Sequence, residues 1–156
     1  MNIDQIEEDN SDLFDGFQNG SLHMAVTLIP NWNGSPEDAV DLDLCFHFDD
    51  WEALFFGTLH AHKWDPYTEG DDIFEHNERN RRKFHESIPN YPTLRTIYDM
   101  YEDYEFDLTQ TKTLREECIK LRPQATEPEA IKALRKLIYG CDQAIALNGN
   151  LFFSCD

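Results

Sequence analysis

The stretch VDLDLCFHF, residues 40–48, decides the fold, because apolar and polar side chains alternate along it without interruption. A period of two is typical of a β-strand that buries one of its faces. The buried face is expected to carry Val40, Leu42, Leu44, Phe46 and Phe48, and the opposite face Asp41, Asp43, Cys45 and His47. The sequence therefore predicts a sheet with one covered face.

Two more strands are expected beside this one. LHMAVTLI (residues 22–29) is apolar and partly alternating, and ALFFGTLHAH (residues 53–62) follows the short connection DDWE (residues 49–52). Turn-forming residues fill the segment PNWNGSPEDA, residues 30–39. The simplest assembly is a three-stranded antiparallel meander in which residues 40–48 and 53–62 form a hairpin. LFF, residues 151–153, is expected to return as a short strand at the sheet edge.

Four helices are expected after residue 70, from apolar spacing and from helix end signals. Their ranges are Asp71–Ser87, Thr93–Tyr104, Thr113–Leu121 and Thr126–Leu147. The last two are expected to open with the capping boxes Thr113/Glu116 and Thr126/Glu129. Asn148-Gly149 is expected to end the last helix, whose apolar stripe is Ile131, Leu134, Ile138, Cys141 and Ile145.

These elements together predict an α+β fold, in which an antiparallel sheet of three or four strands has about four helices packed on one face. The length of 156 residues suits one domain. We expect residues 1–20 to form an acidic N-terminal arm and residues 21–156 to form a single α+β domain.

The first half of the chain carries the whole excess of charge. The net charge is −18, with 19 acidic residues and only Lys63 as a basic residue in residues 1–78. Residues 79–156 contain 12 residues of each sign. Folding does not require this imbalance, which either keeps the protein in solution or attracts a basic partner. The sign argues against nucleic acid or an anionic membrane as a direct partner.

The remaining composition predicts a cytoplasmic protein without a cofactor. No apolar run approaches the roughly 20 residues of a membrane helix, and the acidic start lacks the features of a signal peptide. The sequence contains no phosphate-binding or dinucleotide-binding glycine motif. Its cysteines are widely spaced and are expected to be reduced core or surface thiols: Cys45, Cys118, Cys141 and Cys155.

Two histidines in GTLHAHKWD, residues 57–65, raise the question of a metal site. If residues 53–62 form a strand, His60 and His62 share one face, which can hold a metal ion. A metal-dependent hydrolase is therefore one hypothesis, with a third ligand from Asp41, His47 or Asp72. The sequence has no HExxH motif and no cysteine pair to strengthen it. A partner-binding face, or a solvated face with incidental histidines, explains the same pattern.

An acidic surface with aromatic anchors is the leading hypothesis for the functional site. Trp51 and Trp64 are the expected anchors, since buried tryptophans often dominate the energy of an interface. Acidic residues around them are expected to speed association with a basic partner. The expected contact residues are Asp41, Asp43, Asp49, Asp50, Trp51, Glu52, Trp64, Asp65, Asp71 and Asp72.

Two segments resemble small acidic bacterial immunity proteins of polymorphic toxin systems. One is FFGTLHAHKWD, residues 55–65, and the other runs from LREECIKL to the closing IKALRKLIYGCDQAIALNGNLFFSCD. Together they cover under half of the chain. The resemblance implies a cytoplasmic protein that binds and neutralises a toxin made by the same cell or its kin. It points to His60 and His62 and to no other functional residue.

The favoured function is therefore that of a binding protein rather than an enzyme. We expect an immunity protein whose acidic surface neutralises a cognate basic toxin, for example a nuclease. A phage-type DNA mimic that inhibits a restriction or CRISPR effector would use the same acidity. The metal-dependent hydrolase described above is the third hypothesis.

Overall fold

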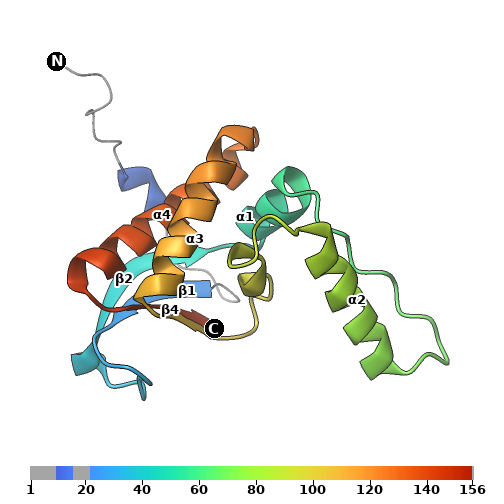
Figure 1. The fold of residues 1–156 in the computed structure, drawn as a ribbon, viewed down its shortest axis with the longest axis horizontal. Coiled ribbons are helices and arrows are strands. Elements are labelled where there is room, and N and C mark those ends of the chain that lie inside the picture. The colour runs from blue at the N-terminus through green and yellow to red at the C-terminus, as the bar shows by residue number, and fades with distance from the viewer. Residues whose placement is uncertain (1–9, 16–21, 156) are drawn as a thin grey trace.

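A four-stranded antiparallel sheet lies at the centre of the fold (Figure 1). The structure, a computed structural model, describes residues 10–15 and 22–155. The strands lie in the order β2-β1-β4-β3, so β1 and β4 are the inner pair. Their bounds are β1 Leu22–Thr27, β2 Ala39–Phe46, β3 Tyr104–Phe106 and β4 Asn150–Cys155. The predicted α+β class with an antiparallel sheet is confirmed.

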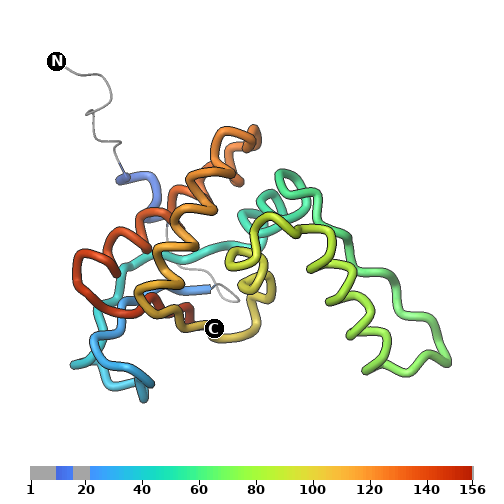
Figure 2. Tube along the Cα trace, in the orientation of Figure 1, coloured from blue at the N-terminus to red at the C-terminus, as the bar shows by residue number. Residues whose placement is uncertain are grey.

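Helices cover one face of this sheet. The α-helices are α1 Phe48–Glu52, α2 Ile73–Ser87, α3 Leu108–Leu121 and α4 Pro128–Leu147. α4 packs against β1, β2 and β4, and α3 packs beside it and against β3 and β4. On the opposite face the ring of Trp32 lies edge-on to Phe152, with ring centroids 5.1 Å apart. α2 extends away from the sheet and approaches the rest of the fold at its C-terminal end (Figure 2).

Residues 40–46 of the alternating stretch form β2 as expected, with one irregularity, whereas Phe48 begins α1. Leu42, Leu44 and Phe46 are buried, whereas Val40 and Phe48 are exposed. The pairing of β1 with β2 shifts between Met24 and Ala25, which marks a β-bulge. Such a bulge bends the strand and leaves extra residues unpaired.

The bulge is built by two of the acidic residues in the strand. The Asp43 backbone adopts a φ of 55°, and its N–H donates to the Asp41 carboxylate at 2.8 Å. Aspartate tolerates this left-handed conformation better than most residues and often accepts from the backbone two positions on. Asp41 and Asp43 therefore shape the strand locally.

The predicted strand over residues 53–62 is wrong. α1 runs on without interruption into the π-helix η4, Ala53–Thr58, whose wide turn is closed by a bond from the Leu59 N–H to the Leu54 carbonyl at 3.0 Å. The apolar run is short, and Trp51, Leu54 and Phe55 also have the i, i+3, i+4 spacing of a helix face. The expected hairpin partner of β2 is therefore absent, and β2 is an edge strand of the described sheet. The segment expected at the sheet edge, β4, instead lies inside the sheet between β1 and β3.

Three of the four helices predicted after residue 70 are present as α2, α3 and α4, whereas α1 was not predicted. α2 is confirmed, but it buries His76, Asn80 and Phe84, while Ile73 and Phe74 are exposed. Residues 93–104 form only a short 3-10 turn, η5 Leu94–Ile97, and then enter β3.

The other two helices begin at different residues from those expected. α3 begins at Leu108 with a capping box of Asp107 and Gln110, not of Thr113 and Glu116. α4 begins at Pro128 after Glu127 without a side-chain cap, so the expected Thr126 box is also wrong. The left-handed cap at Asn148 is confirmed, with a φ of 52°.

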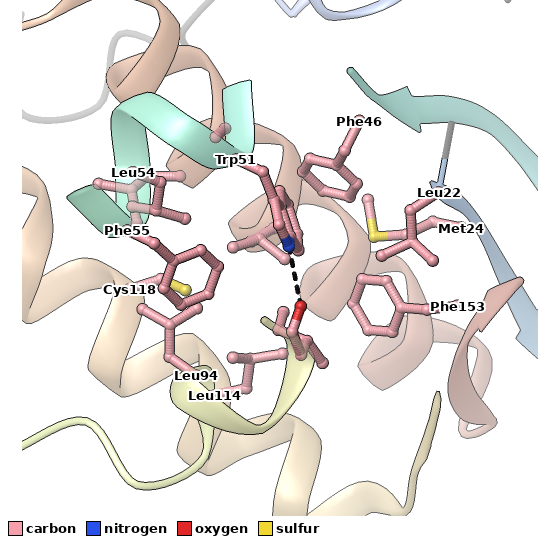
Figure 3. Packing of buried hydrophobic residues seen from close by; sticks show 14 of the residues in the cluster. Leu22, Met24, Phe46, Trp51, Leu54, Phe55, Leu94, Leu114, Cys118 and Phe153 are labelled. Atoms are coloured by element: carbon pink, nitrogen blue, oxygen red, sulfur yellow. Dashed lines mark hydrogen bonds between the residues drawn. The ribbon is translucent and has the colours of Figure 1, made fainter. Parts of the chain in front are cut away.

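The core lies between the sheet and these helices, and Trp51 is at its centre (Figure 3). The Trp51 ring is 4.5 Å from the ring of Phe46 and 5.6 Å from that of Phe55, between centroids. Its indole N–H donates to the Ile97 carbonyl at 2.9 Å, as drawn in Figure 3. This bond satisfies the one polar atom of a side chain that is only 4% exposed.

Part of the expected N-terminal arm belongs to the folded body. Residues 10–15 include a short 3-10 turn, Ser11–Leu13, and Leu13 is completely buried. Asp12 pairs with Arg135 of α4 at 2.7 Å. Residues 1–9 and 16–20 of the arm lie outside the described residues.

Among the described residues, no helix is both long and apolar enough to cross a membrane. The longest, α4, has 20 residues but carries several charged side chains.

We predict that α4 stabilises the fold mainly through its buried face. Leu137→Ala removes a side chain that is 0% exposed, whereas Leu147→Ala in the same helix changes one that is 43% exposed. The first change is expected to lower the free energy of unfolding by about 2–5 kcal/mol, and the second by under about 1 kcal/mol. Urea unfolding of both variants measures this difference, and equal losses would contradict the described packing of α4.

Candidate functional site

An aromatic groove lies where α1 and η4 meet α2 and the segment after η5. It has a volume of about 460 Å³, which is within the usual range for binding pockets. Eight of its eleven lining residues are aromatic: Phe48, Trp51, Phe55, Phe56, Trp64, Phe84, Tyr98 and Tyr101. The other three are Glu52, Asp99 and Met100. We call this surface the aromatic groove.

The rings of the groove are continuous with the core. Phe55 contacts Phe84 with ring centroids 5.6 Å apart, and Phe84 contacts Tyr98 at 4.8 Å. Tyr98 in turn lies parallel to Trp64, with centroids 6.3 Å apart and an interplanar angle of 20°. The groove therefore has a floor that is fixed by core packing, while its outer rings reach solvent.

The local backbone explains why neighbouring phenylalanines serve different surfaces. The π-helix η4 places Phe55 in the core at 2% exposure, while Phe56 is only partly buried and lines the groove. π-Turns are uncommon and are often found at functional sites.

An acidic pocket adjoins the groove, and Glu52 and Phe56 line both. Its volume is about 380 Å³. Four carboxylates and one ammonium group line it, those of Asp49, Glu52, Glu127, Glu129 and Lys63. Gly57 lets the Glu127 carboxylate approach closely, since a Cβ at this position would lie 2.5 Å from Oε1. We call this surface the acidic pocket.

The Tyr98 phenol in the groove wall is neutral at physiological pH. Burial raises its pKa above the ordinary value, and the nearby Arg81 only partly offsets this. The lining of the groove therefore includes a neutral hydroxyl at Tyr98 beside the carboxyl groups of Glu52 and Asp99.

The structure brings only some of the predicted contact residues together. Trp51, Glu52 and Trp64 line the aromatic groove, and Asp49 and Glu52 line the acidic pocket. Trp64 is 41% exposed, as an anchor requires. Asp41 and Asp43 are exposed but lie at the bulge of β2, outside the linings of both the groove and the pocket.

Two predicted contact residues are not on the surface. Trp51 and Asp50 are each only 4% exposed. Trp51 packs in the core, and the Asp50 carboxylate pairs with the Lys136 ammonium at 3.2 Å. Neither side chain is exposed, because α1 turns its Asp50–Trp51 side inward, and Trp51 contributes to the lining of the aromatic groove from the core.

Three more predicted acids have partners or roles within the fold. Asp65 pairs with Lys83 at 2.8 Å, and this interaction lowers the pKa of its carboxyl. The Asp72 carboxylate accepts the N–H groups of Phe74 and Glu75 and so caps α2. Asp71 is exposed beside it, at the start of a helix that reaches away from the groove.

The histidine pair lies in a loop after η4, because the strand that would have aligned the two rings is absent. His60 is exposed and has a φ of 53°. The His62 ring nitrogen Nε2 lies 3.3 Å from the Asp65 carboxylate. The backbone N–H of His62 donates to the Ser87 hydroxyl at 2.9 Å. The prediction that His60 and His62 lie on one strand face with Asp41 is therefore wrong.

A different donor group, Asp15, Cys45 and His47, has ligand atoms within 4.8 Å of one another. His47 Nε2 lies 3.5 Å from an Asp15 oxygen and 3.9 Å from the Cys45 sulfur. In a catalytic triad the acid and the nucleophile contact different nitrogens of the histidine ring. Asp15 and Cys45 both lie near Nε2 of His47, so these three residues do not form a triad.

The Asp15 carboxylate already belongs to an ion-pair network. Lys136 Nζ lies 3.0 Å from Asp15, 3.2 Å from Asp50 and 2.8 Å from the Cys45 carbonyl oxygen. Lys132 also approaches Asp15, at 3.3 Å. Burial opposes ionisation of Asp15, but the two lysines outweigh it and lower the pKa of the carboxyl. Two ammonium groups so close disfavour a metal cation at this carboxylate.

The four cysteines form no disulfide. Burial raises the pKa of Cys141 to about 12 and that of Cys118 well above its ordinary value. Both thiols are therefore neutral, which suits packing in the core and not nucleophilic chemistry.

No family model, no curated protein and no solved structure matches the chain.

Sequence reasoning missed most of the groove. Phe48, Tyr98 and Tyr101 were assigned to a strand face or to a helix, and Glu127 and Glu129 to a helix start. The available signal was the density of aromatic residues between positions 46 and 104. It did not show which rings meet.

We predict that Lys136 contributes far more to stability than its neighbour Lys132. Lys136 is completely buried, so Lys136→Met leaves the buried Asp50 without a cation and is expected to cost about 3–5 kcal/mol. Lys132→Met removes a partly exposed pair and is expected to cost under about 1 kcal/mol. Urea unfolding at neutral pH compares them, and similar losses would show that the network around Asp50 is not stabilising.

Proposed function

We propose that the protein binds a basic protein partner through the aromatic groove and the acidic pocket, and inhibits that partner. The observation that carries this proposal is the shared wall of the two sites, formed by Glu52 and Phe56. A stable interface typically has a desolvated aromatic centre surrounded by polar residues. The groove supplies the aromatic centre, and the acidic pocket supplies part of the polar surround.

The distribution of charge supports a basic partner. Residues 1–78 have a net charge of −18, and η4, α1 and Trp64 come from this part of the chain. Among the described residues, Asp49 and Glu52 form no ion pair within the protein, whereas Asp15, Asp50 and Asp65 do. Their charge is available to steer and hold a cationic surface.

The groove favours a toxin inhibitor over a DNA mimic. A DNA mimic needs a pattern of surface carboxylates that replaces phosphates, and an apolar groove adds nothing to that function. An inhibitor that docks on a folded toxin benefits from aromatic anchors beside the charges. The resemblance to small acidic immunity proteins of polymorphic toxin systems agrees with this function.

We predict that neutralising the acidic pocket slows association with the partner. Asp49→Asn with Glu52→Gln is expected to lower the association rate constant several-fold at low salt and to weaken its salt dependence, because rim charges act mainly on association. The partner is first captured from a lysate of the source organism, identified by mass spectrometry, and then measured in purified form by biolayer interferometry.

The matched control is Glu37→Gln with Glu116→Gln, which removes the same charge from two exposed residues outside both sites. It is expected to leave most of the association rate unchanged. A captured partner without a basic surface, or equal effects of the two double variants, would contradict the proposal. Inhibition is checked by assaying the activity of the partner with and without the wild-type protein.

A further inference from the structure

Resting on the proposed function, we infer that the aromatic groove binds an arginine side chain of the basic partner. The groove combines two features that together select a guanidinium group. Exposed aromatic rings line it, and two carboxylates line the same groove.

The exposed rings belong to three of the lining residues. Tyr101, Phe48 and Trp64 are 78%, 66% and 41% exposed. A cation is attracted to the face of an aromatic ring, most strongly to that of tryptophan. Arginine suits such a site better than lysine, because its planar group stacks on rings and is more weakly hydrated.

The carboxylates argue against a purely apolar occupant. Glu52 and Asp99 line the same groove as the rings. An apolar side chain that filled the groove would remove water from these carboxylates and give nothing in return, which is unfavourable. A guanidinium group donates charge-assisted hydrogen bonds to carboxylates, often two at once.

The floor of the groove suits the stem of the same side chain. Trp51, Phe55 and Met100 are buried and apolar along this floor. The methylene groups of arginine pack on apolar surface while the charged end remains near polar groups. The aromatic contacts from Phe55 through Phe84 to Tyr98 and Trp64 hold the walls in place before binding.

We predict that short peptides reveal this preference without the natural partner. The probes are three peptides, Ac-Gly-Gly-X-Gly-Gly-NH2, in which X is arginine, citrulline or leucine. Citrulline has nearly the shape of arginine but no charge. Isotope-labelled full-length protein is titrated at low ionic strength, and the NMR shifts of backbone amides and tryptophan indoles give the affinity and the location of binding.

The arginine peptide is expected to bind about tenfold more tightly than the citrulline and leucine peptides. Its shifts are expected at Trp64 and around Glu52 and Tyr98. Trp64→Leu keeps an apolar side chain, although a smaller one, but removes the ring face, so it is expected to abolish most of the arginine preference. The matched control Phe74→Leu changes a ring that is 80% exposed at the distant start of α2 and is expected to leave that preference intact.

The inference is overturned if the citrulline or leucine peptide binds as tightly as the arginine peptide, or if the shifts fall outside the groove. It is also overturned if Trp64→Leu and Phe74→Leu have the same effect. These results leave the proposed function standing, because that proposal is tested with the captured partner and the acidic-pocket variants. Absence of a basic partner in that capture would instead remove the premise.

Discussion

The buried ammonium group of Lys136 joins parts of the chain that are far apart in sequence. It contacts Asp15 near the N-terminus, the Cys45 carbonyl at the end of β2 and Asp50 in α1. Asp50 also accepts the His47 N–H at 3.1 Å and so fixes the start of α1. An unpaired buried charge is very unfavourable, so these groups hold one another in a single arrangement. The direction in which α1 leaves the sheet, and therefore the position of the groove, depends on this network.

The groove is an outward extension of the core. One series of aromatic contacts leads from Phe46 through Trp51, Phe55 and Phe84 to Tyr98 and Trp64. Most of α2 extends away from the body, yet its C-terminal half is fixed by Phe84 in this series (Figure 1). A site held in this way loses little conformational entropy when it binds, because its rings are already ordered. The acidic residues around it add attraction at longer range.

Local patterns in the sequence were sufficient for several of the elements but not for all of them, nor for their arrangement. Alternation identified β2, and periodicity identified α2 and α4, because these signals need only neighbouring residues. The run at residues 53–62 fits a strand and a helix equally well, and the contacts that decide are distant: Asp50 with Lys136, and Trp51 with the Ile97 carbonyl. The same limit applies to the site. Trp64, Asp49 and Glu52 are exposed, as expected of surface residues, whereas Asp50 and Trp51 are buried. Asp50 and Trp51 differ from Asp49 and Glu52 only in the side of the short helix α1 that they occupy.

The place of β4 has a consequence for how the protein emerges from the ribosome. β4 follows every other described element in the chain, yet it lies between β1 and β3 in the sheet. Its residue Cys155 pairs with Leu22, the first residue of β1. During synthesis β1 and β2 can form a hairpin early, but one edge of β1 has no partner until β4 has been made. The apolar side chains of Leu22, Met24 and Val26 also remain uncovered until α4 has been made. An unpaired apolar edge favours association with other chains, so we expect the growing chain to be more prone to aggregation before β4 has been made than after the sheet is complete.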